Sequence, residues 1–174
     1  MPSGRLDFIV GQSVGITRSH RGKEPHVAPQ RQRAQVDVHL ILRRGDDILL
    51  GQRINTGWAD GQWHVPSGHG EDRESALHTL VRETGEEIGI AIDAAEARFA
   101  HLVHHYTESA RMAVFFEVTR WTGEPVNTEP DKCTGWRWFP LTDLPDPLIP
   151  YAAQALAHYS KGEPYSERGW EDMP

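Results

Sequence analysis

The segment that decides the fold runs from Gly68 to Ile90 and reads GHGEDRESALHTLVRETGEEIGI. Positions suited to burial recur in it at helical spacing: Leu77, Leu80, Val81, Thr84 and Ile88. This spacing predicts a helix over residues 73–88 with one continuous stripe turned inward. Gly89 follows as a typical helix stop.

Three carboxylates share one face of this predicted helix. Glu83, Glu86 and Glu87 stand at positions i, i+3 and i+4, where like charges repel. A hard divalent cation with oxygen ligands offsets such repulsion, and magnesium suits phosphate substrates. Three glutamates alone would favour an ordinary solvated helix face. Glu74 and Arg82 lie about 80 degrees apart around the helix axis, so they can be bridged.

A longer pattern distinguishes a metal site from an ordinary solvated helix face. Gly68, five residues, Glu74, seven residues and then Arg82-Glu83-Thr84-Gly85-Glu86-Glu87-Ile88-Gly89-Ile90 resembles the Nudix box, with eight of nine specified positions matched. Thr84 replaces the usual aliphatic residue. The resemblance implies the α/β (α+β) class and the Nudix fold, a mixed central β-sheet sandwiched between α-helices. Beyond the box, the chain is similar to MutT-like members of the nucleoside triphosphate pyrophosphohydrolase type.

The resemblance also implies the roles of individual residues. Box glutamates hold Mg²⁺ in this family, and Mn²⁺ can substitute for it. The implied metal ligands are Glu83, Glu86, Glu87, the backbone carbonyl of Ser67, and Glu129 from the downstream loop. Family members differ in which residue is the general base; our hypothesis is Glu83, with Glu86 beside it in the catalytic set. Glu74 and Arg82 would brace the loop against the helix, and Gly68 and Gly89 would complete the motif.

Substrate contacts are expected upstream and downstream of the box. Arg53 ends the second predicted strand, where relatives often place an arginine on the phosphates; an ordinary surface arginine is the alternative. Trp63 and Trp136 can stack on a planar base, although core or loop packing is the more common role of such tryptophans. MutT-type enzymes that prefer oxidised guanine carry an asparagine after the last strand. Residues 146–148 read Asp-Pro-Leu, which argues against that preference.

The rest of the chain divides into three parts. Residues 1–33 lack periodicity and are expected to be an N-terminal extension or linker, with a short strand at 8–10. Residues 34–160 are the expected Nudix hydrolase domain, and residues 161–174 a polar C-terminal tail. Alternating residues predict a strand at 36–42, and further strands are predicted at 48–50, 63–65, 100–105, 112–121 and 136–139. Helical spacing predicts a final helix at 151–159.

Composition limits the environment and the partners. The net charge of -7 offers no footprint for a nucleic-acid polymer. The only cysteine, Cys133, rules out an internal disulfide and favours a cytoplasmic location. No stretch approaches the roughly 18 consecutive apolar residues of a membrane span. His101, His104 and His105 fit the alternation of a strand better than a zinc site. A homodimer is expected by analogy with the family alone.

Together these features predict magnesium-dependent hydrolysis of a diphosphate linkage in a small-molecule substrate. The favoured substrate is a nucleoside triphosphate, giving the monophosphate and pyrophosphate. One alternative is a nucleotide sugar or another diphosphate compound. A second alternative is a non-catalytic nucleotide-sensing module, but such modules usually lose box glutamates that this chain keeps. Isomerases of the same fold use a cysteine upstream of the box, whereas Cys133 lies downstream.

Overall fold

The computed structural model describes residues 31–171, so the strand expected at 8–10 lies outside the described part. The elements in chain order are β1 Gln35–Arg44, β2 Asp47–Arg53, β3 Trp63–His64, β4 Ser67–His69, α1 Ala76–Ile88, a 3₁₀ turn Ala94–Glu96, β5 Arg98–Tyr106, β6 Ala110–Val118, β7 Cys133–Pro140, α2 Pro150–Tyr159 and β8 Tyr165–Arg168.

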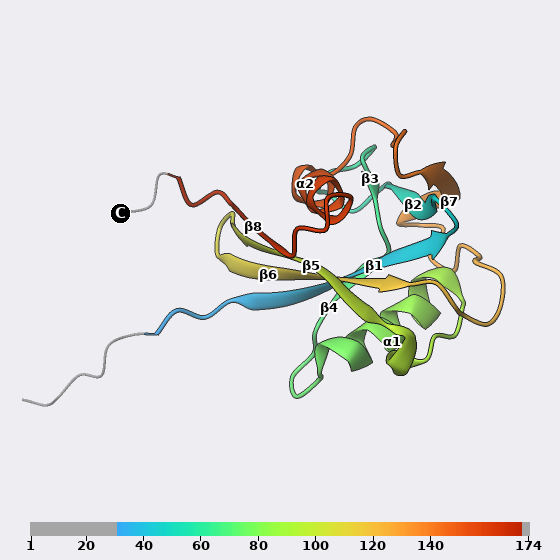
Figure 1. Ribbon diagram of the computed structural model, residues 1–174, viewed down its shortest axis with the longest axis horizontal. Helices are drawn as coiled ribbons and strands as arrows, with labels where there is room; N and C mark the ends of the chain where they lie inside the picture. The colour runs from blue at the N-terminus through green and yellow to red at the C-terminus, as the bar shows by residue number, and fades with distance from the viewer. Residues whose placement is uncertain (1–30, 172–174) are drawn as a thin grey trace, which may run out of the picture. The chain divides into compact units, whose positions relative to one another are not determined.

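These strands form a mixed sheet, with α1 on one face and α2 on the other (Figure 1). The strand order is β3-β2-β1-β6-β5-β8, while β4 pairs with β1 and β7 pairs with β2. β1 runs parallel to β6 and antiparallel to both β2 and β4. This arrangement confirms the predicted α/β (α+β) class with a mixed central sheet between helices.

Each face of the sheet carries its own hydrophobic core because side chains alternate along β1. On the α1 face, Val38 and Leu40 pack with Leu80 and Ile88 of the helix. On the α2 face, Ile41 and Phe115 pack with Ala155 and Leu156 of the second helix. Polar residues continue the α2 face beyond this core; they include Asp37, His39 and His105, all buried.

α1 begins later than the periodicity predicts. Arg73 has φ 65°, a left-handed conformation that a helix cannot include. Ser75 then caps the helix by accepting a hydrogen bond from the backbone N–H of His78, so the first helical residue is Ala76. At the other end Gly89 has φ 67°, the left-handed cap expected of a glycine there.

The polar C-terminal segment contains a strand that the sequence pattern does not predict. β8 pairs in parallel with β5, placing Tyr165 opposite Leu102 and Arg168 opposite His105. Ser166 is buried on this strand, and its hydroxyl lies 2.9 Å from Nε2 of His101. Four residues with one buried position are too short for a period-two signal, so the description of residues 161–174 as a tail needs this correction.

Candidate active site

Gly68 on β4 lies directly against Glu83 on α1. A Cβ atom at position 68 would come within 1.8 Å of Cδ of Glu83, closer than any side chain allows. The glycine therefore lets the strand and the carboxylate share one position. The adjacent residue Ser67 is not among the positive-φ residues, so a serine fits the neighbouring position without strain.

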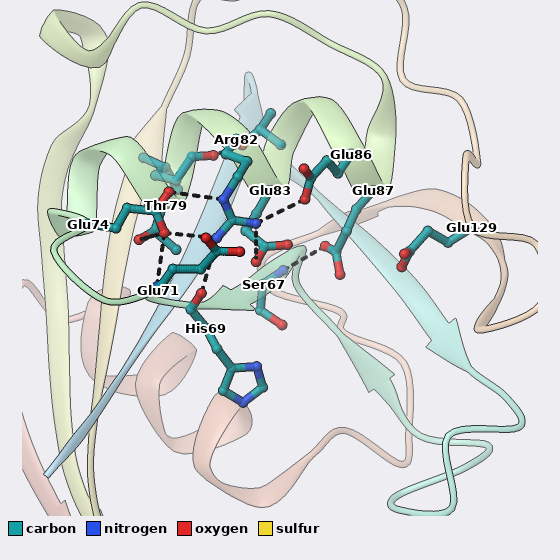
Figure 2. A network of polar contacts seen from close by, with 12 residues as sticks. Ser67, His69, Glu71, Glu74, Thr79, Arg82, Glu83, Glu86, Glu87 and Glu129 are labelled. Carbon is teal, nitrogen blue, oxygen red and sulfur yellow. Dashed lines mark hydrogen bonds and ion pairs between the residues drawn. The ribbon is translucent and has the colours of Figure 1, made fainter.

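Arg82 joins the loop before α1 to the acidic face of the helix (Figure 2). Its Nε and one Nη donate to the two carboxylate oxygens of Glu74, each at 2.9 Å. The other Nη donates to Glu83 and Glu86, both at 2.9 Å. A bond of 3.1 Å to the carbonyl oxygen of His69 completes the set. All five N–H groups of the guanidinium are therefore used.

Glu74 is the anchor of this network within the loop. Besides the pair with Arg82, it accepts hydrogen bonds from the hydroxyl of Thr79 at 2.9 Å and from the backbone N–H of Glu71 at 3.1 Å. These bonds, led by that from Arg82, lower the pKa of Glu74 to about 2. The carboxylate thus stays charged and holds the loop against the helix.

Glu87 occupies a different environment from the other box glutamates. It accepts a hydrogen bond of 2.8 Å from the backbone N–H of Ser67. Burial is the largest cause that raises the pKa of Glu87, and with the negative charges of Glu83 and Glu129 it brings the pKa to about 8 against the opposing effect of the Ser67 bond. A nearby cation would reverse this shift by favouring the ionised form.

The four candidate carboxylates line one cavity of about 390 Å³: Glu83, Glu86, Glu87 and Glu129. Two cations, Arg53 and Lys132, line the same cavity. Lys132 also binds Glu129, with Nζ 2.6 Å from Oε1. The cavity therefore combines acidic groups that suit a metal ion with basic groups that suit phosphate oxygens.

The donor chemistry of this cavity fits a hard divalent cation. Within residues 31–171, no three acidic, histidine or cysteine side chains converge as a ready metal site, because Glu83 and Glu86 both turn toward Arg82. Carboxylate oxygens are nevertheless the donors that Mg²⁺ prefers. The raised pKa of Glu87 comes first from burial, and the nearby charges of Glu83 and Glu129 add to it, so a bound cation would favour the ionised carboxylate.

The two tryptophans predicted to contact substrate have different positions. Trp63 is only 8% exposed, packs edge-on against Phe139 in the core of the α2 face, and does not line the cavity. Its expected stacking role therefore has no structural support. Trp136 does line the cavity, and its indole N–H donates to the carbonyl oxygen of Glu87 at 3.3 Å.

A second cavity, of about 420 Å³, adjoins the first and was not foreseen from the sequence. The two share Arg53, Ser67, Gly68 and His69 as lining residues. Trp58 lines only the second cavity; the residue is 54% exposed, and the guanidinium of Arg53 lies 5.3 Å from the centroid of its ring. One elongated molecule could therefore occupy both cavities across Arg53.

Comparison with known proteins agrees with this geometry. The family model described as the NUDIX domain matches residues 32–159. The chain therefore belongs to the Nudix family, and it is a MutT-like hydrolase that acts on diphosphate linkages. Within residues 31–171, no helix has the length and apolar character needed to cross a membrane.

Individual relatives are distant. An 8-oxo-dGTP diphosphatase of Proteus vulgaris is 28% identical over 95 residues, which cover 54% of this chain and 83% of that protein. The crystal structure of a MutT NUDIX hydrolase from Burkholderia pseudomallei superposes with a TM-score of 0.67 at 29% identity, covering 72% of this chain and 98% of that one. A MutT protein from Methanosarcina mazei, 20% identical with a TM-score of 0.65 over 76% and 96% of the chains, shares the fold.

Proposed function

We propose that this chain hydrolyses a nucleoside triphosphate to the monophosphate and pyrophosphate, with Mg²⁺ as its cofactor. The observation that supports this best is the single cavity in which four carboxylates lie beside Arg53 and Lys132. The adjoining cavity leaves room for an organic group on one side of the substrate phosphates. Similarity to an 8-oxo-dGTP diphosphatase favours a nucleotide over other diphosphate compounds.

The candidate metal ligands are the carbonyl of Ser67 and the carboxylates of Glu83, Glu86, Glu87 and Glu129. Bound Mg²⁺, or Mn²⁺ in its place, would supply charge neutralisation at the phosphate oxygens and lower the pKa of a coordinated water. Glu87 is protonated in large part near neutral pH without such a cation, since its pKa is about 8. It would therefore release a proton when the metal binds.

The remaining roles belong to side chains around the metal site. Glu83 would accept the proton of the attacking water, since it lines the cavity and Gly68 leaves room for it. Arg53 would bind the phosphates where the two cavities meet, and Lys132 would add a second positive charge. Trp58 offers an exposed ring on which a base can stack.

The test is product release from a panel of nucleoside triphosphates, nucleotide sugars and other diphosphate compounds, with and without Mg²⁺. We expect Mg²⁺-dependent pyrophosphate release from triphosphates, reduced at least about 10²-fold in Glu86→Ala. Glu124→Ala, which removes an exposed carboxylate that lines neither cavity, is the matched control and should keep full activity. Undiminished turnover by Glu86→Ala would contradict the metal assignment, and turnover of a nucleotide sugar alone would contradict the substrate class.

A further inference from the structure

The inner wall of the second cavity contains a charged group that is almost fully buried. Asp37 on β1 is 6% exposed and lines the cavity. Arg111 on β6 holds it in a two-pronged pair, with Nε and Nη2 each 2.7 Å from one carboxylate oxygen. Each oxygen thus accepts one hydrogen bond from Arg111 and keeps further lone-pair capacity.

The hydroxyl oxygen of Tyr151 is a second acceptor on this wall, as the direction of its hydrogen bond to His64 shows. Nδ1 of His64 lies against the carbonyl oxygen of Val65, and Nε2 lies 3.0 Å from the hydroxyl of Tyr151. A carbonyl only accepts, so Nδ1 carries the proton and Nε2 of the neutral ring must accept from Tyr151. The hydroxyl hydrogen of Tyr151 is therefore used, and its oxygen offers only lone pairs.

The carboxylate of Asp37 and the hydroxyl of Tyr151 lie in the same cavity. Tyr151 lines the same cavity as Asp37, and the negative charge of Asp37 contributes, after burial, to the raised pKa of the Tyr151 phenol. The ring of His105 stacks on Tyr151 with centroids 4.8 Å apart and fixes its position. Arg111 retains N–H groups beside them, because Gln35 and Asp37 occupy only part of its donors.

Resting on the proposed function, we propose that Asp37 and Tyr151 are specificity-determining residues that select a nucleobase bearing an exocyclic amino group. The amino N–H groups match the acceptors of the wall, and a carbonyl oxygen of the base can accept from Arg111. A base without the amino group leaves the remaining lone pairs of the Asp37 carboxylate and of the Tyr151 oxygen with fewer donors in a buried site, which costs binding. Trp58 at the same cavity provides the stacking surface.

Matched nucleotide pairs test this directly, because guanine and hypoxanthine differ only by the amino group. We expect kcat/KM for GTP to exceed that for ITP by at least about 10-fold, and CTP to exceed UTP in the same sense. Asp37→Asn adds an N–H donor to the wall and should bring the GTP to ITP ratio close to one, mainly through KM. Equal kcat/KM within both pairs for the unmodified protein would overturn the proposal.

The control and the second variant separate recognition from folding. Glu117→Gln alters another shielded carboxylate of β6. Glu117 pairs with Arg43 of β1 and lies outside both cavities, so the substitution should leave the ratio unchanged. Tyr151→Phe keeps the Asp37–Arg111 pair and should also reduce the ratio. An unchanged ratio in both folded variants, Asp37→Asn and Tyr151→Phe, would contradict the assignment.

A binding measurement keeps the proposal distinct from the proposed function. Calorimetry with GMP and IMP in the absence of metal should show GMP binding at least about 10-fold more tightly. If no triphosphate is hydrolysed but GMP is preferred, the proposed reaction is wrong, while the proposed role of Asp37 and Tyr151 in base selection is supported. If triphosphates are hydrolysed and the two monophosphates bind equally, only the proposed role of Asp37 and Tyr151 in base selection is contradicted.

Discussion

At the scale of single residues, Gly68 and Glu83 show how a missing side chain positions a functional one. The strand β4 carries Gly68 so close to α1 that the glutamate occupies the space a Cβ would fill. The sequence pattern specified both residues and their spacing. It could not specify that they touch, because that contact depends on the packing of β4 against the helix.

Gly68→Ala should therefore disable catalysis by displacing Glu83. We expect kcat to fall by about 10²-fold or more, since a shift of about 1 Å in a catalytic group has that effect. Gly70→Ala is the matched control: its Cβ would meet Thr79 at 3.5 Å and Val36 at 3.6 Å, which are ordinary contacts. Steady-state kinetics on both folded variants measures the difference; equal kcat values would argue against the steric role of Gly68.

His39 affects how stability depends on pH, because the fold buries its ring. It is 2% exposed, neither ring nitrogen has a hydrogen-bond partner among residues 31–171, and the ring stacks on Phe115 with centroids 4.4 Å apart. Burial lowers its pKa well below the usual value, and burial also lowers the pKa of His101 and His105. The unfolded chain consequently binds more protons than the folded one in acid.

These histidines predict that stability is lost as pH falls below about 6.5, the ordinary histidine pKa, and is retained above it. Each can contribute a slope of up to about 1.4 kcal/mol per pH unit. His39→Leu should flatten this dependence and be at least as stable near neutral pH, because an unpaired polar group is removed. Urea unfolding across the range measures it. His78→Leu, at an exposed position on α1, should leave the slope unchanged; an equal slope in the His39 variant would refute the explanation.

At the scale of elements, α1 was predictable because its signals are local. Inward spacing, the Ser75 cap and the Gly89 stop all lie within or beside the helix. Its start was misplaced because the left-handed conformation of Arg73 depends on the loop closed by Glu74 and Arg82. Whether Trp63 packs in the core or contacts substrate was left open for a similar reason, since only the pairing of β3 with β2 places it in the core.

Gly85→Ala should stabilise α1 by about 1 kcal/mol, because alanine is the better helix former. Position 85 is exposed, and a Cβ there would meet only the carbonyl oxygen of Ile90, at 3.9 Å. Gly89→Ala should do the opposite, since Gly89 has φ 67° and its Cβ would lie 2.7 Å from Val126. The free energy of unfolding in urea compares the two; destabilisation by Gly85→Ala would indicate that the helix needs this glycine.

At the scale of the whole molecule, contacts between distant segments determine what sequence reasoning missed. β8 pairs with β5, Trp170 donates to the carbonyl oxygen of His104, and Gln154 of α2 donates to that of Glu167. No local pattern predicts such partners. The second cavity escaped notice for the same reason, because β1, β6 and α2 each contribute only one or two of its polar residues.

Truncation after Lys161 should destabilise the fold by at least about 2 kcal/mol, because it removes β8 and exposes the edge of β5. Residues of β8 line neither cavity, so activity per folded molecule should persist. Thermal unfolding and kinetics on the shortened chain test both statements. An unchanged unfolding midpoint would mean that the segment after Lys161 adds no stability, contrary to the role inferred from its pairing with β5.

The guanidinium of Arg82 couples the local unfolding of the loop before α1 to that of the helix. Its five hydrogen bonds tie the loop at His69 and Glu74 to Glu83 and Glu86 of α1. Neither the loop nor the helix can open without breaking bonds that the other needs. The two therefore form one cooperative unit of local unfolding, and the carboxylates stay in register with the loop whenever the unit is closed.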